Sequence, residues 1–137
     1  MYLVEKKDDG KQYAMKVVRK DFVLEEDALE RIIEEKRMLN ENYHPFLVHM
    51  EFGFQNKERL FFVVEYIKGG ELYDHLRNNE RFLEEQTKFY ILQICMAIGF
   101  LHSKNVVHRD IKTENILMNN DGYLVLNDYG LAKELNN

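Results

Sequence analysis

The stretch that decides the fold is HRDIKTEN, residues 108–115. It places a carboxylate (Asp110), an ammonium group (Lys112) and a carboxamide (Asn115) within six residues. An apolar run typical of a helix precedes the stretch and a β-like run follows it. We therefore expect a rigid loop between two regular elements, with Asp110 suited to accept a proton and Lys112 suited to hold an anionic group.

Length and composition indicate one globular domain, since the chain has 137 residues and 45% of them are hydrophobic. The 24 acidic residues outnumber the 19 basic ones, and the net charge of -5 argues against nucleic acid or an anionic membrane as the main partner. The only cysteine, Cys95, lies in an apolar helical run, so we expect an inert core thiol and a reducing compartment. The sequence has neither a signal peptide nor an apolar run of membrane-spanning length, which predicts a cytoplasmic protein.

The first half of the chain reads as two hairpins around one helix. Apolar runs at 1–4 and 13–18 flank an Asp-Gly turn signal and predict the first hairpin. Runs at 46–54 and 60–66 predict the second. Between them, residues 25–40 show helical spacing of apolar residues after an acidic start. The apolar positions are Ala28, Leu29, Ile32, Ile33 and Leu39, and the acidic ones are Glu25, Glu26 and Asp27.

The glycine pair Gly69-Gly70 separates this strand-rich part from a helix-rich part. We expect a hinge at residues 67–70, an N-terminal lobe at 1–66 and the start of a C-terminal lobe at 71–137. The two lobes would meet at this hinge.

The second half is expected to contain two helices and a tight hairpin. The helices are predicted at 71–78 and 84–103, and the longer one is apolar around nearly its whole circumference, so it needs to be buried. After the loop, residues 116–118 and 123–126 predict a hairpin around an Asn-Asp-Gly turn. The triplet Asp-Tyr-Gly at 128–130 follows it.

Two further groups complete the candidate site. Asn115 and Asp128 offer one neutral and one charged oxygen, which suits a hard cation such as Mg²⁺. Lys16 lies on a predicted strand beside the small Ala14, where strand alternation can point the ammonium group into a cleft. There it is suited to clamp the phosphates of a nucleotide, while Ala14 leaves room for a flat base.

A lysine with that task needs an oriented partner, and Glu35 on the predicted helix is the expected one. Glu35 lies three residues after Ile32 and four before Leu39, so it shares their inward face. Glu34 points further round the helix. We therefore predict an ion pair between Lys16 and Glu35.

Together these motifs resemble a eukaryotic protein kinase, and the resemblance covers the whole chain. It is most similar to the AGC group, which contains the cyclic-nucleotide-dependent kinases, Akt and protein kinase C. The motifs that carry it, besides residues 108–115, are Tyr13-Ala14-Met15-Lys16, Glu35-Lys36-Arg37, His44-Pro45-Phe46-Leu47-Val48, Glu65-Tyr66, Gly69-Gly70-Glu71 and Asp128-Tyr129-Gly130-Leu131-Ala132-Lys133.

The resemblance implies an α+β, two-lobe kinase fold that is partial here, with most of the N-lobe sheet and the αC helix and the first part of the helical C-lobe. It implies phosphoryl transfer from ATP with Mg²⁺ to serine or threonine of a protein, with Asp110 and Lys112 as catalytic residues. Adenine would meet Ala14, the gatekeeper Val64, the backbone of Glu65 and Ile67, and Leu117 as the floor of its pocket. Glu71 and Glu114 would bind substrate arginines, which implies a basophilic preference. Leu39, Met50, His108 and Tyr129 would form an apolar spine between the lobes.

The chain also departs from the family pattern. It has no glycine-rich loop and stops seven residues after Gly130, so we expect a fragment that exposes apolar surface along 84–103. Thr113 replaces a common proline, and Tyr129 replaces phenylalanine, which adds a hydroxyl that needs a hydrogen-bond partner. Two alternatives remain open: a nucleotide-binding or interacting pseudokinase, and a truncated product without a function of its own.

Overall fold

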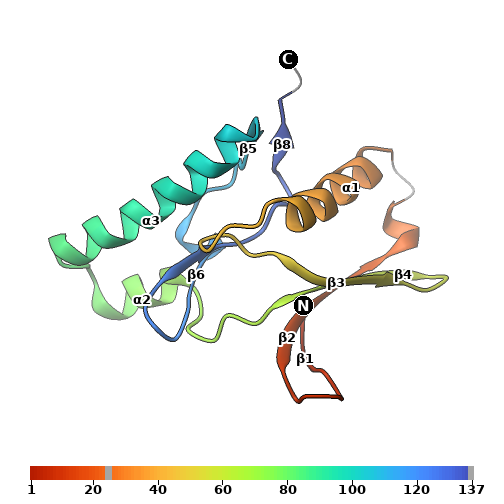
Figure 1. The fold of residues 1–137 in the computed structure, drawn as a ribbon, viewed down its shortest axis with the longest axis horizontal. Coiled ribbons are helices and arrows are strands. Elements are labelled where there is room, and N and C mark those ends of the chain that lie inside the picture. Colours follow the sequence, from red (N-terminus) through yellow and green to blue (C-terminus); the bar gives the residue numbers. More distant parts are fainter. Residues whose placement is uncertain (24–25, 136–137) are drawn as a thin grey trace.

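The computed structural model describes residues 1–23 and 26–135 (Figure 1). Its N-terminal half is built on an antiparallel sheet with the strand order β1-β2-β4-β3. The strands are β1 (Tyr2–Glu5), β2 (Gln12–Arg19), β3 (Met50–Gln55) and β4 (Arg59–Glu65). Both predicted hairpins are present, and β2 pairs with β4 to join them into one sheet.

Helix α1 (Glu26–Glu41) follows a short 3₁₀ turn, η1 (Lys20–Val23), and lies beside the sheet (Figure 1). Its inward face buries Met38 and Leu39. Leu29 and Ile33, two of the apolar positions at helical spacing, are exposed. They line an open apolar hollow of about 250 Å³ between α1 and the sheet. The predicted acidic start at Glu25, Glu26 and Asp27 lies outside the described side chains.

The predicted strand at 46–54 begins only at Met50, because the preceding backbone pairs elsewhere. Leu47 forms a parallel bridge with Leu126. The amide of Leu126 donates to the carbonyl of Phe46 at 2.9 Å, and the amide of Val48 donates to the carbonyl of Leu126 at 3.0 Å. The connection between α1 and β3 is thereby joined to the C-terminal half of the chain.

The C-terminal half contains helices and short strands. Its elements are α2 (Leu72–Asn79), α3 (Glu84–Ser103), β5 (Val106–Val107), the 3₁₀ turn η2 (Thr113–Asn115), β6 (Ile116–Met118), β7 (Leu124–Leu126) and β8 (Lys133–Glu134). Strands β6 and β7 form the predicted hairpin, and Gly122 in its turn has a φ of +82°, a conformation that glycine adopts without steric cost. Strands β5 and β8 form a second antiparallel pair.

One face of α3 is buried and the other is exposed. Gln93, Ala97 and Leu101 are buried, and the side-chain oxygen of Gln93 accepts a hydrogen bond from the amide of Leu124 in β7 at 2.8 Å. The exposed fractions on the other side are 44% for Phe89, 52% for Ile91, 60% for Leu92 and 49% for Met96.

Complete burial of α3 is therefore not observed, whereas the expected exposure of apolar surface along 84–103 is confirmed. The expectation of a buried core thiol is also wrong, because Cys95 is exposed. Within residues 1–23 and 26–135, no helix combines the length and apolar character that crossing a membrane requires.

The segment after β4 approaches β6 very closely at Gly69. A Cβ atom at position 69 would lie 2.2 Å from the carbonyl oxygen of Met118. The next carbonyl, of Gly70, accepts a hydrogen bond from the amide of Met118 at 2.9 Å, and Glu71 forms an antiparallel bridge with Leu117. Glycine is required at 69 because any side chain would collide with the backbone of β6.

Candidate active site

The predicted ion pair between β2 and α1 is present. The Nζ atom of Lys16 lies 2.5 Å from Oε1 of Glu35. Glu35 is only 6% exposed, although the sequence around it is highly charged. The helical spacing explains this, because it turns Glu35 toward the sheet together with Leu39. The pair fixes the position of the Lys16 ammonium group.

Replacing Lys16 with methionine is expected to lower the free energy of unfolding by about 1–3 kcal/mol, because Glu35 would lose its partner while remaining buried. Chemical denaturation of the protein measures this. In the double variant Lys16→Met/Glu35→Met, much of the loss should be recovered. The control is Lys88→Met, which breaks exposed pairs with Glu84 and Glu85 at 2.9 and 3.0 Å and should cost less than about 1 kcal/mol. A loss no larger than that of the control would refute this assignment.

The loop at 108–115 orients Asp110 through two side chains. Oδ2 of Asp110 accepts a hydrogen bond from Nζ of Lys112 at 2.9 Å and another from Nδ2 of Asn115 at 2.7 Å. The bond from Lys112, together with that from Asn115, holds the pKa of the Asp110 carboxyl below its ordinary value. Asp110 is therefore ionised at neutral pH, and among the described residues neither bond engages its Oδ1.

His108 and Arg109, which directly precede Asp110, hold the loop in place through hydrogen bonds. Burial lowers the pKa of His108, so its imidazole is neutral at pH 7. Nε2 of His108 donates to the carbonyl of Asn127 at 3.2 Å, and Nδ1 accepts from the amide of Asp110 at 3.3 Å. Arg109, with a φ of +65°, donates from Nε to the carbonyl of Leu131 at 2.6 Å. These bonds fix the loop against the segment that follows β7.

The expected metal ligands lie on neighbouring segments. The amide of Asn127 donates to the carbonyl of Asn115 at 2.8 Å, which brings the end of β7 beside the loop. Nδ2 of Asn115 faces two oxygens of Asp110, one carbonyl and one carboxylate, so the side-chain oxygen of Asn115 must point the other way. Asp128 is exposed, and its Oδ1 accepts from the amide of Gly130 at 3.1 Å.

This donor set fits Mg²⁺, which prefers oxygen ligands and is usually held by one or two carboxylates together with substrate phosphates. Among the residues that the structure describes, no group of three or more His, Cys, Asp or Glu side chains could hold a metal ion. Phosphate oxygens would therefore have to complete the coordination.

Residues from both halves of the chain meet in one small cavity of about 20 Å³. Its lining comprises Met1, Lys16, Glu35, Leu39, Phe62, Val64, Asn127, Asp128 and Tyr129. The Lys16–Glu35 pair and Asp128 are thus brought together. Ligand pockets usually measure about 300–1,000 Å³, so this enclosed space alone is too small for a nucleotide.

Of the residues expected around adenine, Val64 lines this cavity. Ala14 and Val64 are opposite each other in the β2–β4 register. Glu65 is the last residue of β4, and burial raises the pKa of its carboxyl. Ile67 packs against the core, and Leu117 lies on β6.

The two carboxylates expected to bind substrate arginines, Glu71 and Glu114, are both exposed. Oε2 of Glu114 accepts a hydrogen bond from Oγ1 of Thr113 at 3.2 Å. Sequence reasoning missed Asn127, whose backbone binds both His108 and Asn115. Its position directly before Asp128 at the end of a strand was the only available signal.

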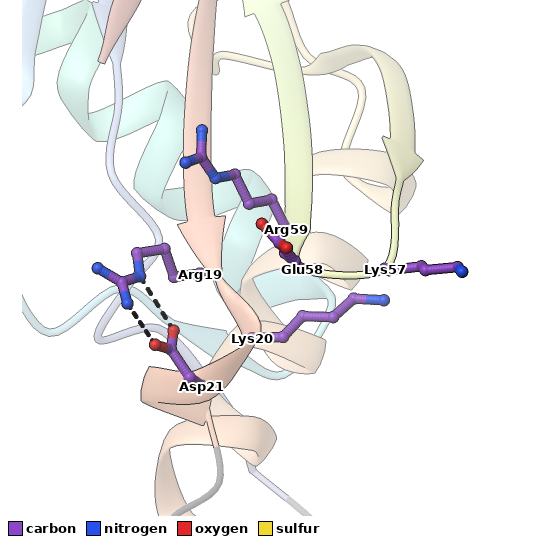
Figure 2. A pocket seen from close by; sticks show the side chains of 6 residues that line it. All are labelled: Arg19, Lys20, Asp21, Lys57, Glu58 and Arg59. Carbon is purple, nitrogen blue, oxygen red and sulfur yellow. Dashed lines mark hydrogen bonds and ion pairs between the residues drawn. The ribbon is translucent and has the colours of Figure 1, made fainter.

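A hollow of about 580 Å³ lies away from these residues, where β2 ends and the β3–β4 turn passes (Figure 2). Arg19, Lys20, Asp21, Lys57, Glu58 and Arg59 line it. Figure 2 shows Arg19 and Asp21 joined by dashed lines. Nε of Arg19 lies 3.1 Å from Oδ1 of Asp21, and Nζ of Lys20 donates to Oε1 of Gln55 at 2.6 Å. Internal partners already satisfy these two cations, so they do not require a ligand.

The whole chain, residues 1–137, matches the family model described as Protein kinase domain. The chain belongs to this family. The chain is 44% identical over 135 residues to "Serine/threonine-protein kinase sgk-1" of Caenorhabditis elegans, and the match covers 98% of the chain and 29% of that protein. It is 45% identical to human "Serine/threonine-protein kinase Sgk2", covering 96% of the chain and 36% of that protein. It is also 43% identical to human "RAC-beta serine/threonine-protein kinase", covering 96% and 27%.

The chain thus spans only about a third of the length of these relatives. The match includes residues 108–115 and 128–130, where the loop and the Asp-Tyr-Gly triplet lie. Family membership and the α+β kinase architecture expected from the sequence are confirmed.

Proposed function

We propose that this chain forms the nucleotide-binding and catalytic part of a protein kinase that transfers the γ-phosphoryl group of ATP, with Mg²⁺, to a serine or threonine hydroxyl. The observation that carries the proposal is the bonding of Asp110. Both side-chain donors reach Oδ2, at 2.9 and 2.7 Å, and Oδ1 remains for an incoming hydroxyl. A fixed, ionised carboxylate beside an ammonium group suits in-line phosphoryl transfer.

In this proposal each site residue has one task. Oδ1 of Asp110 orients the substrate hydroxyl and accepts its proton, and Lys112 neutralises charge on the transferred group. Lys16, held by Glu35 at 2.5 Å, binds the α- and β-phosphates. The oxygens of Asn115 and Asp128 hold Mg²⁺, which would neutralise charge on the phosphates.

Adenine would lie at the junction of the two halves. We assign its contacts to Ala14, Val64, Leu117 and the backbone of Glu65 and Ile67. In the same proposal residues 67–70 form the hinge between an N-terminal lobe, 1–66, and a C-terminal lobe, 71–137. The close approach of Gly69 to Met118, at the boundary between the strand-rich and helix-rich parts, supports this division.

The substrate is proposed to be a protein with basic residues near the acceptor. The exposed carboxylates of Glu71 and Glu114 support this preference, because each can pair with a guanidinium group. The exposed thiol of Cys95 is compatible with a reducing, cytoplasmic setting.

Phosphate transfer from labelled ATP to two serine peptides tests the proposal in the full-length protein. One peptide carries arginines before the serine, and the other has alanine in their place. We expect transfer to both, with kcat/KM about tenfold higher for the arginine peptide, equivalent to about 1.4 kcal/mol. The variant Glu114→Gln should reduce this ratio. Equal use of the two peptides would refute the basic preference, and no transfer to either would refute the kinase proposal.

A second function is supported by the small cavity beside Lys16 and Asp128, which measures about 20 Å³. A protein that uses the kinase fold to bind partners without turning over nucleotide would need no larger space. Calorimetry with Mg²⁺ and ATP, which measures binding, and the peptide assay, which measures transfer, together separate the two functions. Binding followed by transfer supports the kinase, whereas a protein that binds nucleotide without transfer, or does not bind it, supports the second function.

A further inference from the structure

The hydroxyl of Tyr129 is a buried polar group with a long-range partner. Tyr129 is 1% exposed, and it is one of the largest fully buried side chains. Its hydroxyl donates a hydrogen bond to the carbonyl of Val48 at 3.3 Å, between residues 81 positions apart.

The acceptor is equally confined. Val48 is 1% exposed. Among the described residues, the donor to the Val48 carbonyl is the Tyr129 hydroxyl. Two backbone bonds, at 2.9 and 3.0 Å, already join residues 46–48 to Leu126. The Tyr129 hydroxyl adds a third bond between these two segments, at a position three residues after Leu126.

This third bond lies next to a strained position. Asp128 has a φ of +61°, a region that non-glycine residues adopt only when the surroundings hold them there. The bond from Gly130 to Oδ1 of Asp128 supports the conformation from one side. The ring of Tyr129 packs beside the imidazole of His108, with centroids 5.6 Å apart, and both Tyr129 and Asp128 line the cavity that contains Lys16.

We propose that the Tyr129 hydroxyl is a positioning group that ties the Asp-Tyr-Gly segment to the carbonyl of Val48, and thereby keeps Asp128 in the lining of the cavity that it shares with Lys16 and Glu35. This inference rests on the proposed function, in which Asp128 holds Mg²⁺ on a nucleotide. Loss of the hydroxyl leaves a buried carbonyl without its donor and favours arrangements in which residues 128–130 leave this site.

A purely structural hydroxyl and a positioning hydroxyl differ in what they affect. The first would change thermal stability and leave the relative affinities of ligands unchanged. The second would weaken ligands whose binding involves Asp128 and spare ligands that bind only the adenine contacts. Mg²⁺ with ATP is the probe whose binding involves Asp128, and adenosine is the probe that binds only the adenine contacts.

The test compares Tyr129→Phe with the unmodified full-length protein by titration calorimetry, at a temperature below both unfolding midpoints. We expect the Kd for Mg²⁺ with ATP to rise about three- to tenfold, or about 0.6–1.4 kcal/mol, while the Kd for adenosine stays within about twofold. Tyr123→Phe is the matched control, because it removes the same atom from an exposed tyrosine that follows the β6–β7 turn. The control should change neither constant.

Equal Kd values for Mg²⁺ with ATP in the two proteins would overturn the inference. An equal rise for both ligands would also overturn it, since that result indicates a structural role alone. An unmodified protein that binds neither ligand would remove the proposed function and this inference with it. A protein that binds both, with an unaffected Tyr129→Phe variant, would remove the inference only.

Discussion

Replacing Asp110 with asparagine is expected to lower kcat for phosphate transfer by about 10²–10⁴-fold, the range of general-base contributions. The amide oxygen can still accept the hydrogen bond from Lys112, so the loop should keep its shape. Neither atom of the amide can take the proton of the substrate hydroxyl, because an amide is far less basic than a carboxylate. Affinity for Mg²⁺ with ATP should stay within about twofold, because Lys16, Asn115 and Asp128 are unchanged.

Steady-state kinetics and calorimetry on the full-length protein measure the two effects separately. Asp121→Asn makes the same chemical change in the exposed β6–β7 turn and should leave both quantities unaffected. If the Asp110 variant retained full kcat, the proposed task of this carboxylate would be wrong. If it lost nucleotide binding and transfer together, Asp110 would be needed for binding, and a role confined to proton transfer would be excluded.

Gly69→Ala is expected to destabilise the fold by about 3 kcal/mol or more, the upper range for overpacking in a closely packed site. The added Cβ would lie 2.2 Å from the carbonyl oxygen of Met118 and 2.9 Å from its carbonyl carbon. Both are backbone atoms, so no rotamer change can relieve the contact. Relief requires moving the 69–71 segment away from β6, which would break the bond between Gly70 and Met118.

Gly99→Ala provides the matched control for chemical denaturation. Gly99 lies within α3, and apart from its chain neighbours and the nearby backbone of α3 itself, no heavy atom of the described residues lies within 4 Å of a Cβ built there. Alanine at a helix interior should stabilise the protein by about 0.5–1 kcal/mol, so the two substitutions should act with opposite signs. Equal stability of the Gly69 variant and the unmodified protein would show that this contact is looser than the structure indicates.

Local sequence patterns predicted those features that depend on residue spacing or on a turn within a short stretch of chain. The spacing of Glu35 from Ile32 and Leu39 was enough to predict its pair with Lys16, now observed at 2.5 Å. The turn signals predicted both strand hairpins and the β6–β7 pair. In these cases the information lies within a few residues of the feature.

The predictions that failed concern which segment of the chain packs against an apolar face or pairs with a given backbone stretch. The composition of α3 indicates a need for burial, but it does not specify which segments are present to bury the helix, so Phe89 and Leu92 are exposed here. The same limit applies to Leu29 and Ile33 on α1. The predicted start of strand β3 at residue 46 was wrong, because the backbone at Leu47 pairs with Leu126, which is nearly 80 positions away in the chain.

For the candidate site, sequence reasoning placed the polar side chains and missed the backbone that holds them. The need of the Tyr129 hydroxyl for a partner was foreseeable, whereas the carbonyl of Val48 as that partner was not. Nor was the double role of the Asn127 backbone. Backbone groups carry no sequence signal of their own, so these contacts appear only in three dimensions.

The bridge between Leu47 and Leu126 has a consequence for how α1 can move. It fixes the chain shortly after the C-terminal end of the helix, and Asn42 adds a bond from its side chain to the carbonyl of Met38 at 3.0 Å. A rigid rotation of α1 therefore has its pivot at this end, and displacement grows with distance from it. Glu35 is six residues, or about 9 Å, from the end of the helix, so it travels less than half as far as the opposite end, which adjoins the hollow lined by Leu29 and Ile33.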